Sequence, residues 1–257
     1  MLNADTNQYE ELKRIAQSRN LQVISYGRQA EDLRLEDLSL DGTHQIAHIT
    51  YKKHSYKLRL SFIGKFQILN ALCAAGVVIG SGVEAEKVLP LLEKLKPVMG
   101  RLELVGFTKT GGAVYVDYAH TPDALHECLL SLRPYVAGVL TLVFGCGGNR
   151  DQSKRPLMGK IAAQFSDTQI LTDDNPRDED PAEIRAQIKA QCPNAYEVPE
   201  RYAAIAKALE MTGKQDAVLI AGKGHEQYQI IKGESMPFDD REIIKELLSQ
   251  TGGKIAA

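Results

Sequence analysis

Short apolar runs alternate with segments of helical pattern from residue 100 to the end of the chain. The apolar runs span 113–116, 139–144, 169–171 and 217–221. The helical segments span 122–132, 156–165, 181–190, 202–211 and 239–248. Strands without alternating polar residues, separated by helices, are typical of a parallel sheet that is covered on both faces. We therefore predict a doubly wound α/β domain over residues 99–257.

A different pattern precedes residue 99. The expected elements are a strand over 22–26, an antiparallel hairpin of 47–51 and 55–62, a buried helix from 64 that ends near Gly80 or Gly82, and an amphipathic helix over 84–95. Pro97 and Gly100 interrupt the helical pattern. We therefore predict two domains, one over residues 1–98 and one over residues 99–257.

The composition excludes several classes of protein. The 257 residues carry 31 basic and 33 acidic side chains, a formal net charge of −2. Proteins that bind DNA or RNA usually have a basic excess, so we expect no nucleic-acid partner. The four cysteines form no C-x-x-C pair, which argues against a disulfide framework or a structural zinc site. The polar N-terminus and the absence of a long apolar run predict no membrane partner and a cytoplasmic location.

Four of the predicted strands lead into polar clusters. The clusters span 117–123, 145–151, 172–177 and 222–226. Their charged side chains include the cations Arg150, Arg177 and Lys223 and the anions Asp117, Asp174 and Glu226. Ligands of open α/β sheets bind beyond the carboxyl ends of the strands, so we expect these clusters to form one site. The set of charges suits a zwitterion with an additional charge, such as an amino acid, beside a nucleotide.

Each cluster also has a purely structural interpretation. Residues 145–148 are then a flexible turn, since they lack the spacing of a dinucleotide or Walker loop. Residues 174–177 are a capped turn before the next helix, and residues 222–226 turn into a hairpin. His120 either caps the helix that follows it or takes part in the chemistry. Cys146 has no recognisable base in the sequence, so we do not expect a nucleophilic cysteine.

Five runs of residues form a specific pattern along the chain. They are VDYAHTPDAL (116–125), FGCGG (144–148), KRPLMG (154–159), TDDNPR (172–177) and AGKGHE (221–226). In this order they resemble the Mur ligases, specifically the MurE type, which adds an amino acid to a UDP-N-acetylmuramoyl dipeptide in peptidoglycan synthesis. The resemblance implies a Rossmann-like C-terminal Mur ligase domain over 99–257 and part of the central ATP-binding domain over 1–98.

The resemblance also implies a reaction and a set of site residues. ATP, with Mg, converts the terminal carboxylate of the dipeptide into an acyl phosphate, which the amine of the incoming amino acid attacks. Position by position, the amino-acid site would consist of Arg150, Asp174, Asn175, Pro176, Arg177, Gly222 and Glu226. The ATP contacts would be Asn70, Arg101 and Asp117. His120 is the candidate for catalysis, and no metal ligand is implied in this chain.

Arg177 is the residue that indicates which amino acid is added. Meso-diaminopimelate differs from lysine by a second carboxylate at its far end. A guanidinium at that end binds this carboxylate through charge-assisted hydrogen bonds and leaves lysine with an unpaired cation beside it. Lysine-adding relatives lack this arginine. The resemblance therefore implies meso-diaminopimelate and UDP-N-acetylmuramoyl-L-alanyl-D-glutamate as the substrates.

Several features of the family do not occur in the sequence. Gly64-Lys65-Phe66 and Gly222-Lys223-Gly224 lack the spacing and the hydroxyl of a phosphate loop. The magnesium ligands and the UDP-binding N-terminal domain are also absent, and Asn149 stands where many relatives have aspartate. We therefore expect the C-terminal half of a MurE ligase, which binds the amino acid but is not active alone.

Three alternatives remain. The N-terminal half can be encoded separately, as a partner of this chain. The chain can also be a non-catalytic amino-acid-binding module derived from a Mur ligase. Finally, it can belong to a sister ligase of the folylpolyglutamate or cyanophycin synthetase type, although the pair DNPR and GKGHE argues against that interpretation.

Overall fold

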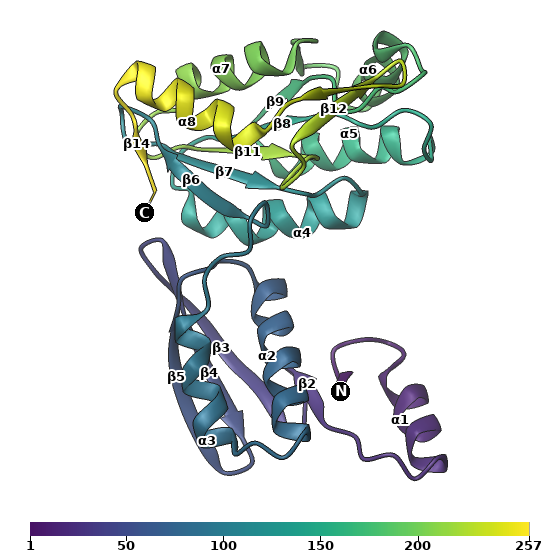
Figure 1. Ribbon diagram of the computed structural model, residues 1–257, viewed down its shortest axis with the longest axis vertical. Coiled ribbons are helices and arrows are strands. Elements are labelled where there is room, and N and C mark those ends of the chain that lie inside the picture. Colours follow the sequence, from purple (N-terminus) through teal and green to yellow (C-terminus); the bar gives the residue numbers. More distant parts are fainter. Residues whose placement is uncertain (257) are drawn as a thin grey trace. The chain divides into compact units, whose positions relative to one another are not determined.

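The protein folds into two compact units. The structure is a computed structural model that describes residues 1–256. The first unit spans Met1–Pro97 and the second begins at Val98. Each unit is a sheet with its own helices (Figure 1). Within residues 1–256, no helix is both long and apolar enough to cross a membrane.

The first unit contains a five-stranded sheet in the order β1-β2-β3-β4-β5. Its elements are β1 (Leu2–Asn3), α1 (Tyr9–Ser18), β2 (Ser25–Gly27), β3 (Leu33–Asp41), β4 (His44–Tyr51), β5 (His54–Leu60), α2 (Lys65–Gly80), α3 (Ala85–Val88) and η1 (Leu89–Lys94). The predicted hairpin is present as β4 and β5. The sequence patterns did not predict α1 or β3. Helix α1 buries only Tyr9 and so gives a weak apolar signal, whereas β3 shows alternating leucines that were visible in the sequence.

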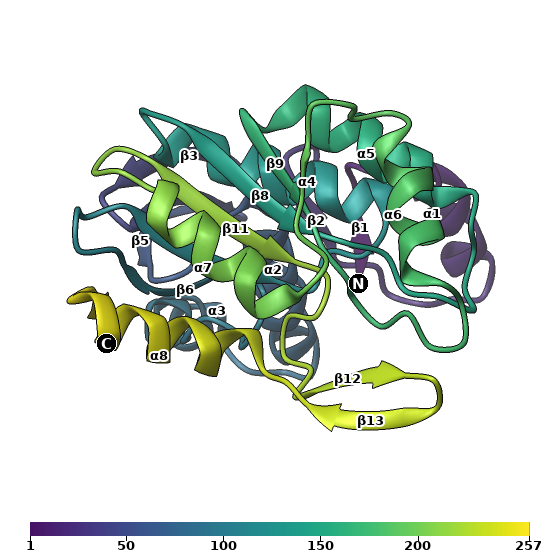
Figure 2. The same cartoon turned by 90° about the horizontal axis from the view of Figure 1, so that it is seen from above.

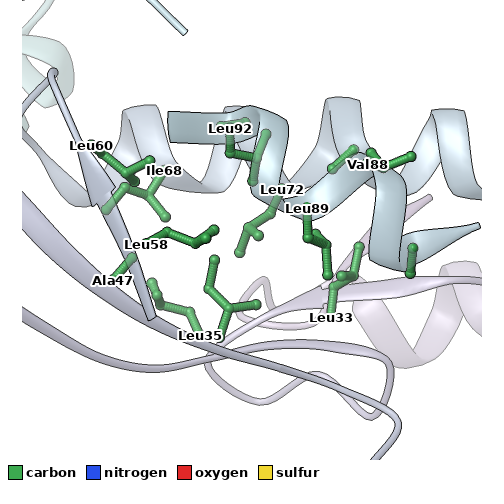
Figure 3. Packing of buried hydrophobic residues seen from close by; sticks show 14 of the residues in the cluster. Leu33, Leu35, Ala47, Leu58, Leu60, Ile68, Leu72, Val88, Leu89 and Leu92 are labelled. Atoms are coloured by element: carbon green, nitrogen blue, oxygen red, sulfur yellow. The ribbon is translucent and has the colours of Figure 1, made fainter. Parts of the chain in front are cut away.

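Alternate side chains of the antiparallel strands form the core of the first unit (Figure 3). The cluster includes Leu33, Leu35, Ala47, Leu58, Leu60, Ile68, Leu72, Leu89 and Leu92. Successive strand residues point to opposite faces, so one face of β3–β5 can pack against α2 and η1.

The helix predicted over 84–95 is wrong in its second half. Helix α3 ends at Val88, and the chain continues as the 3₁₀ helix η1. Pro90 lies in the first turn of η1. Because proline has no amide hydrogen and its ring clashes with the preceding turn, it interrupts an α-helix at this point.

The second unit is a doubly wound α/β domain. Its sheet has seven strands in the order β10-β9-β8-β11-β7-β6-β14. The elements are β6 (Glu103–Phe107), β7 (Ala113–Asp117), α4 (Pro122–Leu132), η2 (Arg133–Tyr135), β8 (Leu140–Phe144), α5 (Lys154–Phe165), β9 (Thr168–Leu171), α6 (Pro181–Lys189), β10 (Tyr196–Glu197), α7 (Arg201–Met211), β11 (Ala217–Ala221), β12 (Tyr228–Ile231), β13 (Glu234–Pro237), α8 (Asp240–Thr251) and β14 (Lys254–Ile255). The strands and helices predicted for this region are present, with small differences at their ends.

Helices cover both faces of this sheet (Figure 1). Helices α7 and α8 share one core with strand residues such as Val114, Val143 and Val218. On the other face α4 packs against α5, and α5 packs against α6. Strands β8 and β11 are therefore buried at every position, which explains why their sequences show no alternation.

Strand β6 differs from the predicted parallel arrangement. Strands β7, β11, β8, β9 and β10 run parallel, whereas β6 pairs antiparallel with β7. Only residues 108–112 connect β6 to β7. A parallel connection needs about a dozen residues or more, so this short turn can join only antiparallel strands.

Candidate functional site

Three loops at the carboxyl ends of neighbouring strands form the centre of the candidate site. They are residues 145–150 after β8, 172–177 after β9 and 222–227 after β11, here called the three-loop cluster. Strands β9, β8 and β11 are adjacent and parallel, so their ends meet at one edge of the sheet. The fourth polar cluster, residues 117–123 after β7, lies next to the third loop, because β7 pairs parallel with β11 and the Gly222 N–H donates to the Asp117 carbonyl oxygen at 3.1 Å. The structure thus brings all four polar clusters of the sequence to one edge of the sheet.

Glycines allow the first two loops to lie in backbone contact. A Cβ on Gly145 would overlap the carbonyl oxygen of Thr172, and one on Gly148 would overlap that of Pro176. The Gly148 N–H donates to the Asn175 carbonyl oxygen at 2.9 Å. Any larger side chain would separate the loops, so the glycine-rich segment is a packing element and more than a flexible turn.

Asn175 connects the second loop with the third. Its Nδ2 donates to Glu226 Oε2 at 2.9 Å, and its Oδ1 accepts from the Ile230 N–H at 3.0 Å. Asn175 is buried, whereas Glu226 is partly exposed. The Glu226 carboxylate is therefore fixed in position and still accessible to a ligand.

Arg177 adopts a left-handed backbone conformation, with φ at +53°. Strand β12 holds it there, because the Arg177 N–H donates to Ile230 O and the Lys232 N–H donates to Arg177 O. Figure 2 shows β12 and β13 as a hairpin that extends from the second unit. Arginine is uncommon at positive φ, so the hairpin stabilises a conformation that an isolated loop would rarely adopt.

The Arg177 guanidinium lies over the glycine-rich loop. Its Nη1 donates to Gly148 O at 2.9 Å and lies 3.3 Å from Asn175 O. Within residues 1–256, Nη1 is the only guanidinium nitrogen of Arg177 that makes a hydrogen bond. The other nitrogens can therefore donate to an anionic ligand.

Asp174 and Gly222 lie in contact. Gly222 has φ at +117°, and a Cβ at this position would overlap Asp174 Oδ2. Asp174 Oδ1 accepts from the Asn175 N–H at 2.6 Å, and its carbonyl oxygen accepts from Gln229 Nε2 at 2.5 Å. Glycine at 222 is thus required both by the backbone angle and by the adjacent carboxylate.

Arg150 is exposed at the end of the first loop, where its Nη1 donates to Asn149 O at 3.0 Å. The Asn149 N–H donates to Glu179, which pairs with the fully buried guanidinium of Arg155 at 2.9 Å. The hydrogen bond from Asn149 and the Arg155 charge lower the pKa of Glu179 below its ordinary value. Glu179 and Arg155 therefore fix the loop that carries Arg150.

Asp117, at the end of β7, binds backbone with both carboxylate oxygens. Oδ2 accepts from the Leu102 N–H at 2.7 Å, and Oδ1 accepts from the Ala119 N–H at 2.6 Å. Burial raises the pKa of Asp117, while hydrogen bonds from Cys128, Leu102 and Ala119 and the charge of Arg101 act in the opposite direction. Asp117 thus fixes the loop next to Arg101, and its predicted contact with ATP stays a prediction.

Arg101 and two histidines surround the Tyr118 ring. The guanidinium carbon of Arg101 lies 4.6 Å from the ring centre. The ring of His120 lies at 4.6 Å, and that of His225, from the third loop, lies at 5.2 Å. A cationic and aromatic group of side chains therefore adjoins the three-loop cluster.

His120 is not the cap of α4. The Thr121 Oγ1 accepts from the Ala124 N–H and caps this helix instead. His120 Nδ1 lies 2.8 Å from the Tyr118 carbonyl oxygen, which can only accept a hydrogen bond. The neutral ring therefore carries its hydrogen on Nδ1 and keeps Nε2 as an acceptor.

The remaining expected residues have other surroundings. Asn70 is exposed on α2 of the first unit. Cys146 is buried, and burial raises the pKa of its thiol to about 12, which leaves little thiolate at neutral pH. Among residues 1–256, no group of three or more His, Cys, Asp or Glu side chains could hold a metal ion.

Three fully buried cations support the site, and sequence reasoning did not identify this role. They are Arg155, Arg201 and Lys223. Arg201 pairs with Asp240 and donates to the carbonyl oxygen of Ala221, directly before the third loop. Lys223 was expected to face a ligand, yet its side chain has no exposed surface. The glycines that flank Lys223 could have indicated from the sequence that its side chain is buried. Nothing near Arg155 or Arg201 in the sequence predicts that these side chains are buried.

The arrangement defines a class of site. Glu226 and Asp174 can accept from ammonium groups, Arg177 and Arg150 can donate to carboxylates, and Arg101 can contact a phosphate. Such a set of groups at the strand ends of a doubly wound domain is typical of a protein that binds a small charged ligand.

Two family models match most of the chain. The Mur ligase middle domain matches residues 1–78, and the Mur ligase glutamate ligase domain matches residues 100–224. The chain therefore belongs to the Mur ligase family, with the middle and C-terminal domains of that family.

Curated relatives are similar over nearly the whole chain. The UDP-N-acetylmuramoyl-L-alanyl-D-glutamate–2,6-diaminopimelate ligase of Zymomonas mobilis is 49% identical over 234 residues, which are 90% of this chain and 48% of the relative. The ligase of the same name from Mesorhizobium japonicum is 45% identical over 235 residues, 91% of this chain and 49% of the relative. The chain thus spans about half the length of the curated relatives it matches.

Solved structures share the fold. A UDP-N-acetylmuramoyl-L-alanyl-D-glutamate–2,6-diaminopimelate ligase matches with a TM-score of 0.66 and 31% identity, over 97% of this chain and 53% of the other. A folylpolyglutamate synthase from Mycobacterium tuberculosis matches with a TM-score of 0.65 over 83% of this chain and 49% of the other. Its identity of 16% indicates a shared fold alone.

Proposed function

We propose that the protein is part of an ATP-dependent ligase that adds meso-diaminopimelate to UDP-N-acetylmuramoyl-L-alanyl-D-glutamate in peptidoglycan synthesis. One observation carries the proposal. The Asn175–Glu226 hydrogen bond lies in the same loop cluster as the Arg177 guanidinium, which donates to the Asn175 carbonyl oxygen. An acceptor for an ammonium and a donor for a carboxylate thus occur together, and the names of the relatives support the same substrate.

The incoming amino acid would bind the three-loop cluster. Its contacts would come from Arg150, Asp174, Asn175, Pro176, Arg177, Gly222 and Glu226. Meso-diaminopimelate carries two ammonium groups and two carboxylates, so it can satisfy the Glu226 carboxylate and the Arg177 guanidinium at once. Lysine has no carboxylate for Arg177 and would bring a cation close to it.

The proposed ATP contacts are Asn70, Arg101 and Asp117. We assign residues 1–98 to the ATP-binding central domain, with Asn70 as a contact, and residues 99–257 to the domain that binds the amino acid. The Arg101 guanidinium suits a phosphate, and Asp117 would act by fixing the loop next to it. ATP, when bound, supplies the phosphoryl group that activates a carboxylate. The 257 residues contain no Walker spacing, so we expect binding without ATP turnover by this chain alone.

His120 is the proposed general base. An amine attacks an acyl phosphate only in its neutral form, so the incoming ammonium must lose a proton. The Nε2 of neutral His120 can accept a proton, because Nδ1 is occupied by the Tyr118 carbonyl oxygen.

A non-catalytic amino-acid-binding module is the second candidate. All seven residues proposed to contact the amino acid lie in the second unit. Amino-acid binding would therefore not require the remainder of a ligase, which can be a separately encoded partner or can be absent.

Calorimetric titrations of the full chain with meso-diaminopimelate, L-lysine and ATP test the proposal. We expect meso-diaminopimelate to bind at least about tenfold more tightly than lysine, as one charge-assisted contact predicts. Equal affinities would refute the specificity. Adding the N-terminal half of the Zymomonas mobilis relative, with ATP and the dipeptide substrate, distinguishes the two candidates. Formation of the tripeptide product favours the ligase, and binding without product favours the module.

A further inference from the structure

Lys223 lies beneath the third loop with its side chain fully buried. Its Nζ is 3.3 Å from Glu226 Oε2 and 3.4 Å from Asn175 Oδ1, and it also donates to the carbonyl oxygen of Tyr228. An ammonium group has three N–H donors, so these three acceptors use all of them. Lys223 therefore has no donor left for a ligand, although sequence reasoning counted it among the cations of the site.

The contacts of Lys223 determine the orientation of the Asn175 amide. Asn175 Oδ1 faces two donors, Lys223 Nζ and the Ile230 N–H. If the amide were rotated by half a turn, its NH₂ group would face both donors and would lose its contact with Glu226. The network thus permits only the orientation in which Asn175 Nδ2 donates to Glu226 Oε2.

The same contacts leave one oxygen of Glu226 available. Oε2 accepts from both Asn175 and Lys223. Among residues 1–256, no hydrogen bond reaches Oε1, and 19% of the Glu226 side chain is exposed. The carboxylate therefore has one fixed oxygen and one oxygen that a ligand can reach.

We propose that Lys223 is a positioning residue that sets the orientation of Asn175 and Glu226, so that Glu226 Oε1 receives an ammonium group of the amino-acid ligand. The inference rests on the proposed function for the nature of the ligand. A compact ammonium suits this role, since it can serve three acceptors on different sides, whereas the planar guanidinium of arginine cannot. Removing the positive charge leaves the partly buried Glu226 carboxylate without its cation and releases the Asn175 amide.

A double-mutant cycle on the full chain tests the proposal. Calorimetry with meso-diaminopimelate is carried out on the wild type, Lys223→Met, Glu226→Gln and the double variant. Lys160→Met, on the exposed side of α5, is the matched control. We expect Lys223→Met to weaken binding by about tenfold or more, and the control to leave it unchanged. We also expect the double variant to bind within about twofold of Glu226→Gln, because Lys223 acts through Glu226.

Losses that multiply in the double variant would indicate a packing role and would overturn the proposal. Unchanged binding by Lys223→Met would overturn it too. If the wild type does not bind meso-diaminopimelate, the proposed function fails and the positioning role is tested separately. That test also serves if Lys223→Met does not fold. It measures the hydrogen exchange of the Asn175 side-chain amide in the wild type. The signal of this amide is identified by its disappearance in Asn175→Asp. Slow exchange is expected from the bond to Glu226, and exchange as fast as in an exposed amide would overturn the orientation.

Discussion

The Arg201 guanidinium and the Asp240 carboxylate form a two-point ion pair in which neither side chain has exposed surface. Nε donates to Oδ1 and Nη2 donates to Oδ2, each at 2.7 Å. The same Nη2 donates to Ala221 O at 3.1 Å. The pair therefore links the first turns of α7 and α8 to the end of β11, directly before the three-loop cluster.

Replacing Asp240 with asparagine should destabilise the second unit strongly. The substitution leaves the Arg201 charge buried without a partner, and breaking a buried pair in this way costs about 3–5 kcal/mol. Urea unfolding measures the loss. Glu210→Gln, an exposed change on α7, should shift the free energy of unfolding by less than about 0.5 kcal/mol. A similar small shift for Asp240→Asn would show that the pair does not stabilise the fold.

Replacing Arg177 with alanine should weaken the binding of meso-diaminopimelate far more than the binding of lysine. The guanidinium contact with a carboxylate is worth about 1.5–3 kcal/mol, so the affinity for meso-diaminopimelate should fall by roughly 10- to 150-fold. Calorimetry with both amino acids checks this. Arg177 also donates to Gly148 O, so its loss can loosen the loops. An equal loss for both ligands would point to that structural effect and would contradict the specificity role.

Replacing Gly222 with alanine should disrupt the site, whereas Gly233→Ala should not. Both glycines have positive φ, at +117° and +79°, so both alanines introduce backbone strain of about 1–3 kcal/mol. Only at 222 would the new Cβ overlap a neighbour, Asp174 Oδ2, since the space around Gly233 is open. We expect loss of meso-diaminopimelate binding for Gly222→Ala alone. Comparable binding by the two variants would mean that Asp174 can move without consequence.

Glu179 should contribute to stability above about pH 4.5 and lose this contribution in acid. Its pKa is lowered in the folded protein by the Asn149 N–H and by Arg155. A lowered pKa means that the folded state binds the proton less tightly than the unfolded state, so stability falls as pH drops below the ordinary value towards the folded one. Thermal unfolding of the wild type and of Glu179→Gln between pH 3.5 and pH 7 provides the measurement. The wild type should be more stable near pH 7, and the difference should shrink with decreasing pH. A difference that does not depend on pH would rule out this ionic contribution.

Local patterns in the sequence predicted most of the elements of the second unit. Helix α4 begins at Pro122, directly after its N-cap Thr121, and the capping and backbone preferences of these two residues act within a few residues. Strand β11 is recognisable because burial on both faces requires an unbroken apolar run. Helix α1, with Tyr9 as its buried residue, gave no comparable signal. Nor did the sequence patterns indicate that β6 runs antiparallel.

The sequence by itself also determined that polar side chains gather at one edge of the sheet, because parallel strands bring their carboxyl ends together. Only the tertiary structure decided what each of these side chains contacts. Lys223 is buried under its own loop, Asp117 binds backbone, and Glu226 is fixed by Asn175, 51 residues earlier in the chain. Whether a charged side chain faces a ligand or supports its neighbours depends on which distant groups desolvate it and offer partners. No local pattern of residues carries that information, because those partners meet only when the sheet has formed.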